Sequence, residues 1–188
     1  MGTGLEHRWQ TCCGSNGRMP RQRRMAPGGF VYHVCNRGSR KGVLFADSRD
    51  FDGFVRLLHR AREERPIKII AYCLLRTHIH LLLWPAGDGD LSRFMHWLES
   101  VHASAWHRQR RSRGTGAVYQ SRFVSVGISE DRHYYTALRY VERNALAAKL
   151  VKRAQDWRWC SASPRSRLTL DSGPYPRPAN WFAILNGE

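Results

Sequence analysis

Apolar side chains recur along the chain with two different periods, and the alternation of these periods predicts the order of strands and helices. Short apolar runs rich in β-branched and aromatic residues indicate strands, whereas spacings of three and four residues indicate helices. Strand patterns occupy residues 30–35, 67–75, 78–84 and 118–126. Helical patterns run from an N-cap at Asp47 to Pro66, over residues 91–105, and from a cap at Ser129 to about Ala145.

The resulting order of strand, helix, strand, strand, helix, strand and helix is a split βαβ pattern. It predicts an α+β, ferredoxin-like domain with helices on one face of a mostly antiparallel sheet. Only Arg76 and Thr77 separate the second strand from the third. We therefore expect these two strands to form a tight antiparallel hairpin.

Composition divides the chain into three parts. Residues 1–27 are polar, Gly-rich and Arg-rich without an apolar period, so we interpret them as a disordered or non-native basic arm. Residues 28–160 carry all the strand and helix patterns and form the expected folded domain. Residues 161–188 are a Ser-, Pro- and Arg-rich C-terminal extension, in which the apolar residues 181–185 can dock on the domain.

The basic arm allows two interpretations. Its arginines, among them Arg23 and Arg24, either contact DNA or belong to a solvated tail. Met1, Met19 and Met25 are alternative natural starts of the chain.

The charge of the chain favours a polyanionic partner. Its 188 residues include 31 Lys and Arg against 15 Asp and Glu, which gives a net charge of +16 and a pI near 10.6. Such an excess suits nucleic acid first and an anionic membrane surface second. No apolar run reaches the roughly 18 residues of a membrane span. Five scattered cysteines without a Cys-x-x-Cys pair predict reduced thiols and a cytoplasmic protein. If its partner is DNA, such a protein is expected to be nucleoid-associated.

Two histidines, His78 and His80, stand one residue apart in an apolar run. In a strand, residues two apart point to the same face, so the two imidazoles would lie side by side. Two adjacent imidazoles fit poorly into an apolar core because their ring nitrogens need partners. They are either half of a metal site or a structural pair bonded to neighbours. His33, on the first strand, is a further possible neighbour of this site.

The last predicted helix carries a second group of polar side chains. Tyr140 and Asn144 are four residues apart and therefore share one helical face, which flanks the apolar stripe. His133 lies on the same flank and is a further candidate metal ligand. A structural role for Tyr140, as a half-buried aromatic on an amphipathic helix, is the alternative.

Four segments resemble, in the same order, those of the REP-associated tyrosine transposases, which are relatives of the single-tyrosine insertion-sequence transposases. A His-x-His pair alone is weak evidence, but the four segments together cover about residues 19–163. The segments are the first strand with Asn36-Arg37-Gly38, the strand with His78 and His80, Tyr119-Gln120-Ser121-Arg122-Phe123, and Tyr140-Val141-Glu142-Arg143-Asn144.

The resemblance implies an HUH-type catalytic domain that cleaves and rejoins single-stranded DNA at hairpin-forming repeats. A divalent metal, Mg²⁺ or Mn²⁺, would bind to His78, His80 and Asn144. Tyr140 would attack the scissile phosphate and form a 5′-phosphotyrosine. A monomer would use its own Tyr140, whereas a homodimer could place it in the partner's site. The expected DNA contacts are Arg37, Gln120, Arg122, Arg139, Arg143, Arg23 and Arg24.

The chain departs from the family pattern at three places. Arg76-Thr77 replaces the usual Pro-Asn before the first histidine, Ala145 replaces a proline after Asn144, and His107 stands where the family has Asn. These changes leave open an alternative function, a catalytically weak protein that binds nucleic-acid hairpins. A zinc-stabilised structural protein is disfavoured because the four-ligand spacing is missing.

Overall fold

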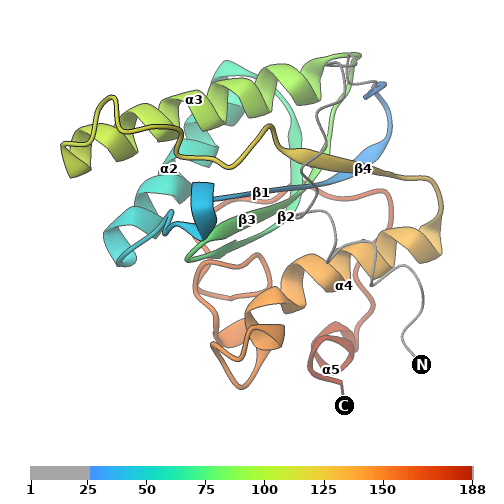
Figure 1. The fold of residues 1–188 in the computed structure, drawn as a ribbon. Helices are drawn as coiled ribbons and strands as arrows, with labels where there is room; N and C mark the ends of the chain where they lie inside the picture. The colour runs from blue at the N-terminus through green and yellow to red at the C-terminus, as the bar shows by residue number, and fades with distance from the viewer. Residues whose placement is uncertain (1–25, 188) are drawn as a thin grey trace.

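The structure, a computed structural model, describes residues 26–187, so Arg23 and Arg24 lie outside the described residues. The fold is a four-stranded sheet with α-helices and two short 3₁₀ helices, η1 and η2 (Figure 1). In chain order the elements are β1 (Val31–Arg37), η1 (Ser39–Lys41), α2 (Ser48–Glu64), β2 (Lys68–Leu75), β3 (His78–Trp84), α3 (Asp90–Arg110), β4 (Val124–Ile128), α4 (Asp131–Ala147), η2 (Ala154–Asp156) and α5 (Trp181–Asn186).

The sheet has the strand order β2-β3-β1-β4, and every neighbouring pair is antiparallel. This confirms the α+β class with an antiparallel sheet. The hairpin of β2 and β3 is also confirmed, since Leu75 pairs with His78 across the two-residue turn. Asp47 caps α2 as expected, because its side chain accepts hydrogen bonds from the backbone N–H groups of Arg49 and Asp50.

The prediction that the helices cover one face of the sheet is wrong. Helices α2 and α3 pack on one face, and α4 and α5 pack on the other (Figure 1). The cause is visible in β2, whose side chains are buried on both sides. Tyr72 and Leu74 face α2 and α3, while Cys73 and Leu75 face α4. A sheet that is apolar on both faces has to be covered on both.

The fourth strand begins later than the sequence pattern indicates, at Val124 instead of residue 118. The preceding segment runs past the end of β1, where Gly38 and Tyr119 form an isolated bridge and the Gln120 N–H donates to the Arg37 carbonyl at 2.9 Å. Its apolar side chains are buried, as in a strand, but its backbone does not continue the ladder with β1.

The C-terminal segment runs along the free edge of β2. Cys160 forms a bridge with Cys73, and the Asp171 N–H donates to the Ile69 carbonyl at 2.9 Å. The chain then reaches α5, which packs on α4 with Trp181 buried, so the predicted docking of residues 181–185 is confirmed.

Glu142 of α4 joins this segment to the sheet although its side chain has no exposed surface. One carboxylate oxygen accepts hydrogen bonds from Ser161 and from Arg177, both at 2.6 Å, and the other accepts one from Trp181 Nε1 at 2.6 Å. The Arg177 guanidinium also donates to the Ile70 carbonyl of β2 at 3.2 Å. A buried charge is tolerated only when it is paired and hydrogen-bonded in this way.

We expect Glu142→Ala to lower the free energy of unfolding by about 3–5 kcal/mol, because it leaves Arg177 and the Trp181 N–H without their acceptor. Glu130→Ala, which removes an exposed acid at the start of the same helix, should change it by less than about 0.5 kcal/mol. Urea unfolding of both variants measures the difference. Equal stabilities would contradict a structural role for the buried carboxylate.

A second buried polar pair joins α3 to the segment before β4. His102 Nδ1 and the Tyr119 hydroxyl lie 2.7 Å apart, and both side chains are buried. Burial lowers the pKa of His102 to about 4; the Asp50 carboxylate raises it and the Arg110 guanidinium lowers it by smaller amounts. The folded protein therefore holds His102 neutral throughout the neutral pH range.

We expect this histidine to make the fold less stable in acid. The unfolded chain binds a proton at His102 below a pKa of about 6.5, whereas the folded chain does not until about pH 4. Stability is therefore full above pH 6.5 and decreases as the pH falls. Between pH 7 and pH 5 the contribution of His102 is about 2 kcal/mol. Urea titrations should show that the free energy of unfolding of His102→Gln changes less between pH 7 and pH 5 than that of wild type, by this amount. The same change in both proteins would contradict a buried, neutral His102.

Candidate functional site

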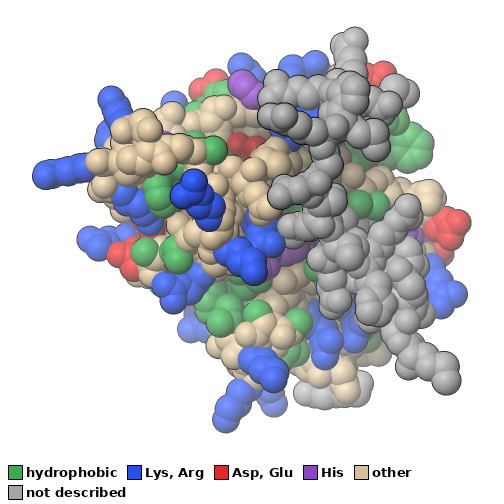
Figure 2. Space-filling model, viewed as in Figure 1, with side chains coloured by type: hydrophobic (Ala, Val, Ile, Leu, Met, Phe, Trp, Pro, Cys, Tyr) green, Lys and Arg blue, Asp and Glu red, His purple; other side chains and the backbone are tan. Residues whose placement is uncertain are grey.

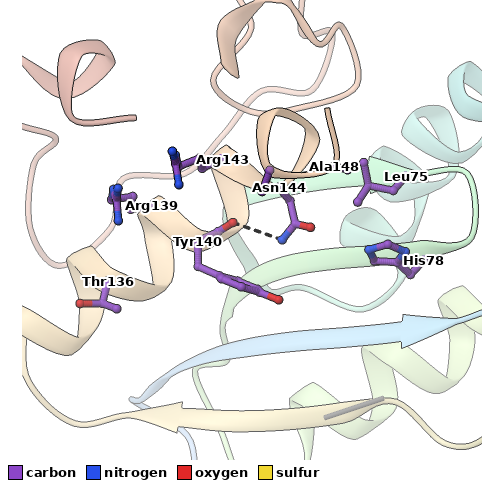
Figure 3. Close-up of a pocket in the computed structure, with 9 residues that line it drawn as sticks. Leu75, His78, Thr136, Arg139, Tyr140, Arg143, Asn144 and Ala148 are labelled. Atoms are coloured by element: carbon purple, nitrogen blue, oxygen red, sulfur yellow. Dashed lines mark hydrogen bonds between the residues drawn. The ribbon is translucent and has the colours of Figure 1, made fainter. Parts of the chain in front are cut away.

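The two histidines of β3 and the polar side chains of α4 meet between the sheet and the helix (Figure 3). Because His78 and His80 alternate with core residues of β3, both point to the face that α4 covers. Their ring centroids lie 4.9 Å apart, and the centroid of Tyr140 lies 5.6 Å from that of His80. The structure thus brings together both predicted histidines and the predicted tyrosine.

Asn144 lies beside His78, one helical turn after Tyr140. Its side-chain nitrogen donates to the Tyr140 carbonyl at 3.2 Å, which turns the amide oxygen towards the side where His78 lies (Figure 3). The Asn144 amide is close enough to the His78 ring to raise the pKa of that imidazole. His133, the rival ligand, is seven residues before Tyr140 and therefore about 10 Å away along the helix axis. The placement favours Asn144 over His133.

A third histidine, His33 of β1, belongs to the same group. Its ring lies parallel to that of His80, with centroids 5.3 Å apart and an interplanar angle of 4°. Its Nε2 lies 3.1 Å from His80 Nδ1, and its centroid lies 5.5 Å from that of Tyr140. The sequence indicated His33 only as a possible neighbour, because the pairing of β1 with β3 that places it here joins residues far apart in the chain.

All three imidazoles are held neutral at physiological pH. Burial lowers the pKa of His33 to about 3, and it lowers that of His80 well below the usual value, with the other two histidines adding to the effect. Burial also lowers the pKa of His78, as does the Arg37 charge, whereas the Asn144 amide raises it. A neutral imidazole has the lone pair that metal ligation requires.

One ring nitrogen at the centre of the group has no hydrogen-bond partner among the described residues. It is Nε2 of His80, which is buried. An orphaned buried nitrogen costs free energy unless something binds it. In residues 26–187 no group of three or more His, Cys, Asp or Glu side chains is arranged to hold a metal. The side chains here that could hold a metal are the two imidazoles of β3 and the Asn144 amide oxygen.

Thr77, one of the departures from the family pattern, is part of this arrangement. Its hydroxyl lies 3.0 Å from His78 Nδ1. The bond fixes the ring of His78 through the nitrogen nearer the backbone and leaves Nε2 for other contacts. Ala145 is a buried residue inside α4, which continues to Ala147, so the second departure leaves the helix intact beyond Asn144.

A pocket of about 340 Å³ opens beside Tyr140 and His78 along the exposed side of α4. Arg139 and Arg143 line it but point away from His78 (Figure 3). Through Nε, Arg139 donates to the Ile184 carbonyl at 3.2 Å and Arg143 donates to the Leu185 carbonyl at 2.9 Å.

The other expected DNA contacts within residues 26–187 lie on β1 and on the segment before β4. Arg37 pairs with His78 in the register of β1 and β3, on the same face of the sheet. Gln120 and Arg122 are exposed on the segment that is hydrogen-bonded to Arg37. The expected contacts therefore stand on three segments, namely α4, β1 and the segment before β4.

A family model described as "Transposase IS200 like" matches residues 29–144, which include both histidines of β3, Tyr140 and Asn144. The chain belongs to the IS200-like transposase family. As an IS200-like transposase it is a DNA-processing enzyme, and the matched region ends at Asn144 itself.

Two solved structures are similar to this IS200-like transposase. One is described as a REP-associated tyrosine transposase bound to a REP hairpin; it has 20% sequence identity and a TM-score of 0.61, over 76% of this chain and 82% of that chain. The other is provisionally assigned as a transposase of Deinococcus radiodurans R1, with 15% identity and a TM-score of 0.46, over 63% and 92% of the two chains. Among curated proteins, none matches. None of the helices in residues 26–187 combines the length and apolar character needed to cross a bilayer.

Proposed function

We propose that this transposase cleaves and rejoins single-stranded DNA at hairpin-forming repeats, with Tyr140 as its nucleophile, in the manner of a REP-associated tyrosine transposase. The observation that carries the proposal is the position of Tyr140, whose ring lies edge-on to the stacked rings of His33 and His80 and one helical turn from Asn144. A tyrosine that only packs against the core does not require two buried imidazoles beside its ring, so this placement supports a role in the chemistry.

In the proposed step the Tyr140 oxygen attacks the scissile phosphorus. A bond forms between the phenol oxygen and phosphorus, the bond from phosphorus to the 3′ oxygen breaks, and the phenol proton ends on the released 3′-OH. The product is a 5′-phosphotyrosine. Because the ester retains the energy of the broken bond, a 3′-OH can attack it and rejoin strands without ATP.

A divalent metal, Mg²⁺ or Mn²⁺, would be held by His78, His80 and Asn144. When bound there, it would polarise the phosphate and stabilise the charge that develops on its oxygens. The buried and unpartnered Nε2 of His80 supports this assignment. Imidazole is a softer donor than Mg²⁺ prefers, so we expect Mn²⁺ to bind more tightly in vitro.

His33 would orient His80 for this role. For His80 to ligate through Nε2, its proton has to be on Nδ1, and Nδ1 lies 3.1 Å from His33 Nε2. His33 would therefore accept this hydrogen bond and carry its own proton on Nδ1. A residue that accepts a hydrogen bond from the second ring nitrogen of a metal-binding histidine fixes the tautomer and the orientation of that imidazole.

The partner proposed is single-stranded or hairpin DNA. The net charge of +16 supports a polyanion, and the relative of known structure is described as bound to a REP hairpin. We place the enzyme on the nucleoid in the cytoplasm. It would act either as a monomer with its own Tyr140 or as a homodimer.

We expect Tyr140→Phe to bind hairpin DNA as the wild type does and to lose all cleavage, since only the attacking oxygen is removed. End-labelled hairpin DNA from the flanks of the gene, incubated with Mn²⁺ or with EDTA, measures this on denaturing gels, where wild type should form a covalent adduct only with Mn²⁺. Tyr135→Phe, on the same helix with its hydroxyl bonded to Pro176, is the matched control and should cleave normally. Cleavage by Tyr140→Phe would contradict the proposal, and binding without cleavage by wild type would favour the hairpin-binding alternative.

We also expect His33→Phe to weaken Mn²⁺ binding about 10- to 100-fold, because the ring volume is kept and the acceptor for His80 is lost. His33→Gln, which retains an acceptor, should lose less. Titration of Mn²⁺ followed by electron paramagnetic resonance measures the affinity, and His102→Gln on the other face of the sheet is the control. An affinity for His33→Phe equal to that of wild type would show that His33 only packs against His80.

A further inference from the structure

A second basic surface lies on the face of the sheet opposite Tyr140, in a groove between α2 and α3 with a volume of about 450 Å³. On α2 the spacing of Arg49, Arg56 and Arg60 places their side chains along one side of the helix. Arg108 and Arg110 of α3 line the other wall. We call this surface the arginine groove.

The positive charge of the arginine groove is only partly neutralised within the described residues. Asp50 is the one acidic side chain that lines it, and its oxygens already accept bonds from Arg110, Gln109 and the Ala46 N–H. Arg110 still has one buried nitrogen, Nη1, without a partner. Arg56 and Arg108 make no ion pair with any described residue and are exposed.

The floor of the groove is open at Gly53. A glycine inside a helix destabilises it relative to alanine, so its presence calls for a reason. A Cβ placed there would meet only the Arg56 Nη2 atom, at 3.7 Å, so packing does not exclude a larger residue. The missing side chain leaves room for a ligand to approach the helix between Arg49 and Arg56.

Further basic side chains connect the groove with the Tyr140 site around one end of the sheet. Arg37 faces His78, and the exposed Arg40, Lys41 and Arg76 follow at the turns of that end. The chain leading into α2 is fixed there, because Leu44 and Phe45 both donate through their N–H groups to the Arg76 carbonyl. In Figure 2, Lys and Arg side chains stand around the left end of the molecule, where α2 begins and α3 ends in Figure 1.

We propose that the arginine groove binds the phosphodiester backbone of the DNA arm that extends from the Tyr140 site, an inference that rests on the proposed function. The arm would pass the end of the sheet over Arg76 and lie between α2 and α3, so that one DNA molecule contacts both faces. Phosphates are the matching ligand because guanidinium groups bind their oxygens in pairs. The arginine groove would contribute affinity and no chemistry.

The test compares two double variants that each remove two positive charges. Arg56→Ala with Arg108→Ala removes two of the five arginines that line the groove, and Arg65→Ala with Arg167→Ala removes two exposed arginines that do not line it. Every variant also carries Tyr140→Phe, and its DNA binding is measured in EDTA, so that cleavage does not affect the result. The probe is a fluorescein-labelled DNA hairpin with single-stranded tails from the flanks of the gene, followed by anisotropy over a range of salt concentrations.

We expect the groove variant to bind on the order of tenfold more weakly, with a salt dependence of log K shallower by about 1.5–2, because two phosphate contacts are lost. The control variant should keep the affinity and the slope of its parent. Gly53→Leu, which fills the groove without changing its charge and with a good helix former, should also weaken binding. Thermal unfolding confirms that each variant is folded.

Equal affinities and slopes for the groove and control variants would overturn the inference. The inference would also be overturned if Gly53→Leu and the groove variant both bound the probe with the affinity of their parent. If these variants bind normally while wild type cleaves through Tyr140, the proposed function stands and only the groove is excluded. A wild-type protein that does not bind the probe would overturn both.

Discussion

The site depends on how α4 is held over the sheet, and the buried carboxylate of Glu142 holds it. Tyr140 and Asn144 stand on either side of Glu142 in the sequence, so any shift of the helix moves them relative to His78. The carboxylate accepts a hydrogen bond from Arg177, which also donates to the Ile70 carbonyl of β2. Its other oxygen accepts a hydrogen bond from Trp181 Nε1 of α5. Because these bonds lie out of water, they are strong and directional. Tyr140, the proposed nucleophile, is thus positioned over the histidines by a network that contains none of them.

Features set by local sequence were predictable. Asp47 caps its helix through bonds to the next residues, the Arg76-Thr77 turn follows from the length of the gap between two strands, and Tyr140 and Asn144 share a face because they are four apart. These arguments need only the geometry of one element or of one turn. Helices and the β2–β3 hairpin were therefore placed within a few residues of their observed bounds.

Features set by long-range pairing were not predictable. His33 enters the site because β1 pairs with β3, and nothing near His33 in the sequence indicates that partner. The start of β4 depends on where the chain leaves β1, and the covering of both faces depends on α4 crossing to the side of Cys73 and Leu75. Nothing near Glu142 in the sequence indicates that it is buried, because the side chains that bury it come from residues 161–181.

The path of the C-terminal segment along β2 also determines how much of the sheet edge is available to pair with another chain. An exposed edge strand offers unpaired backbone groups to any other chain, which is a route to aggregation. Here bonds such as that from the Asp171 N–H to the Ile69 carbonyl occupy the edge of β2. The other edge is β4, a strand of five residues that includes Gly127. Two copies that joined their sheets edge to edge would have to do so through this short strand, which leaves few backbone groups for such pairing.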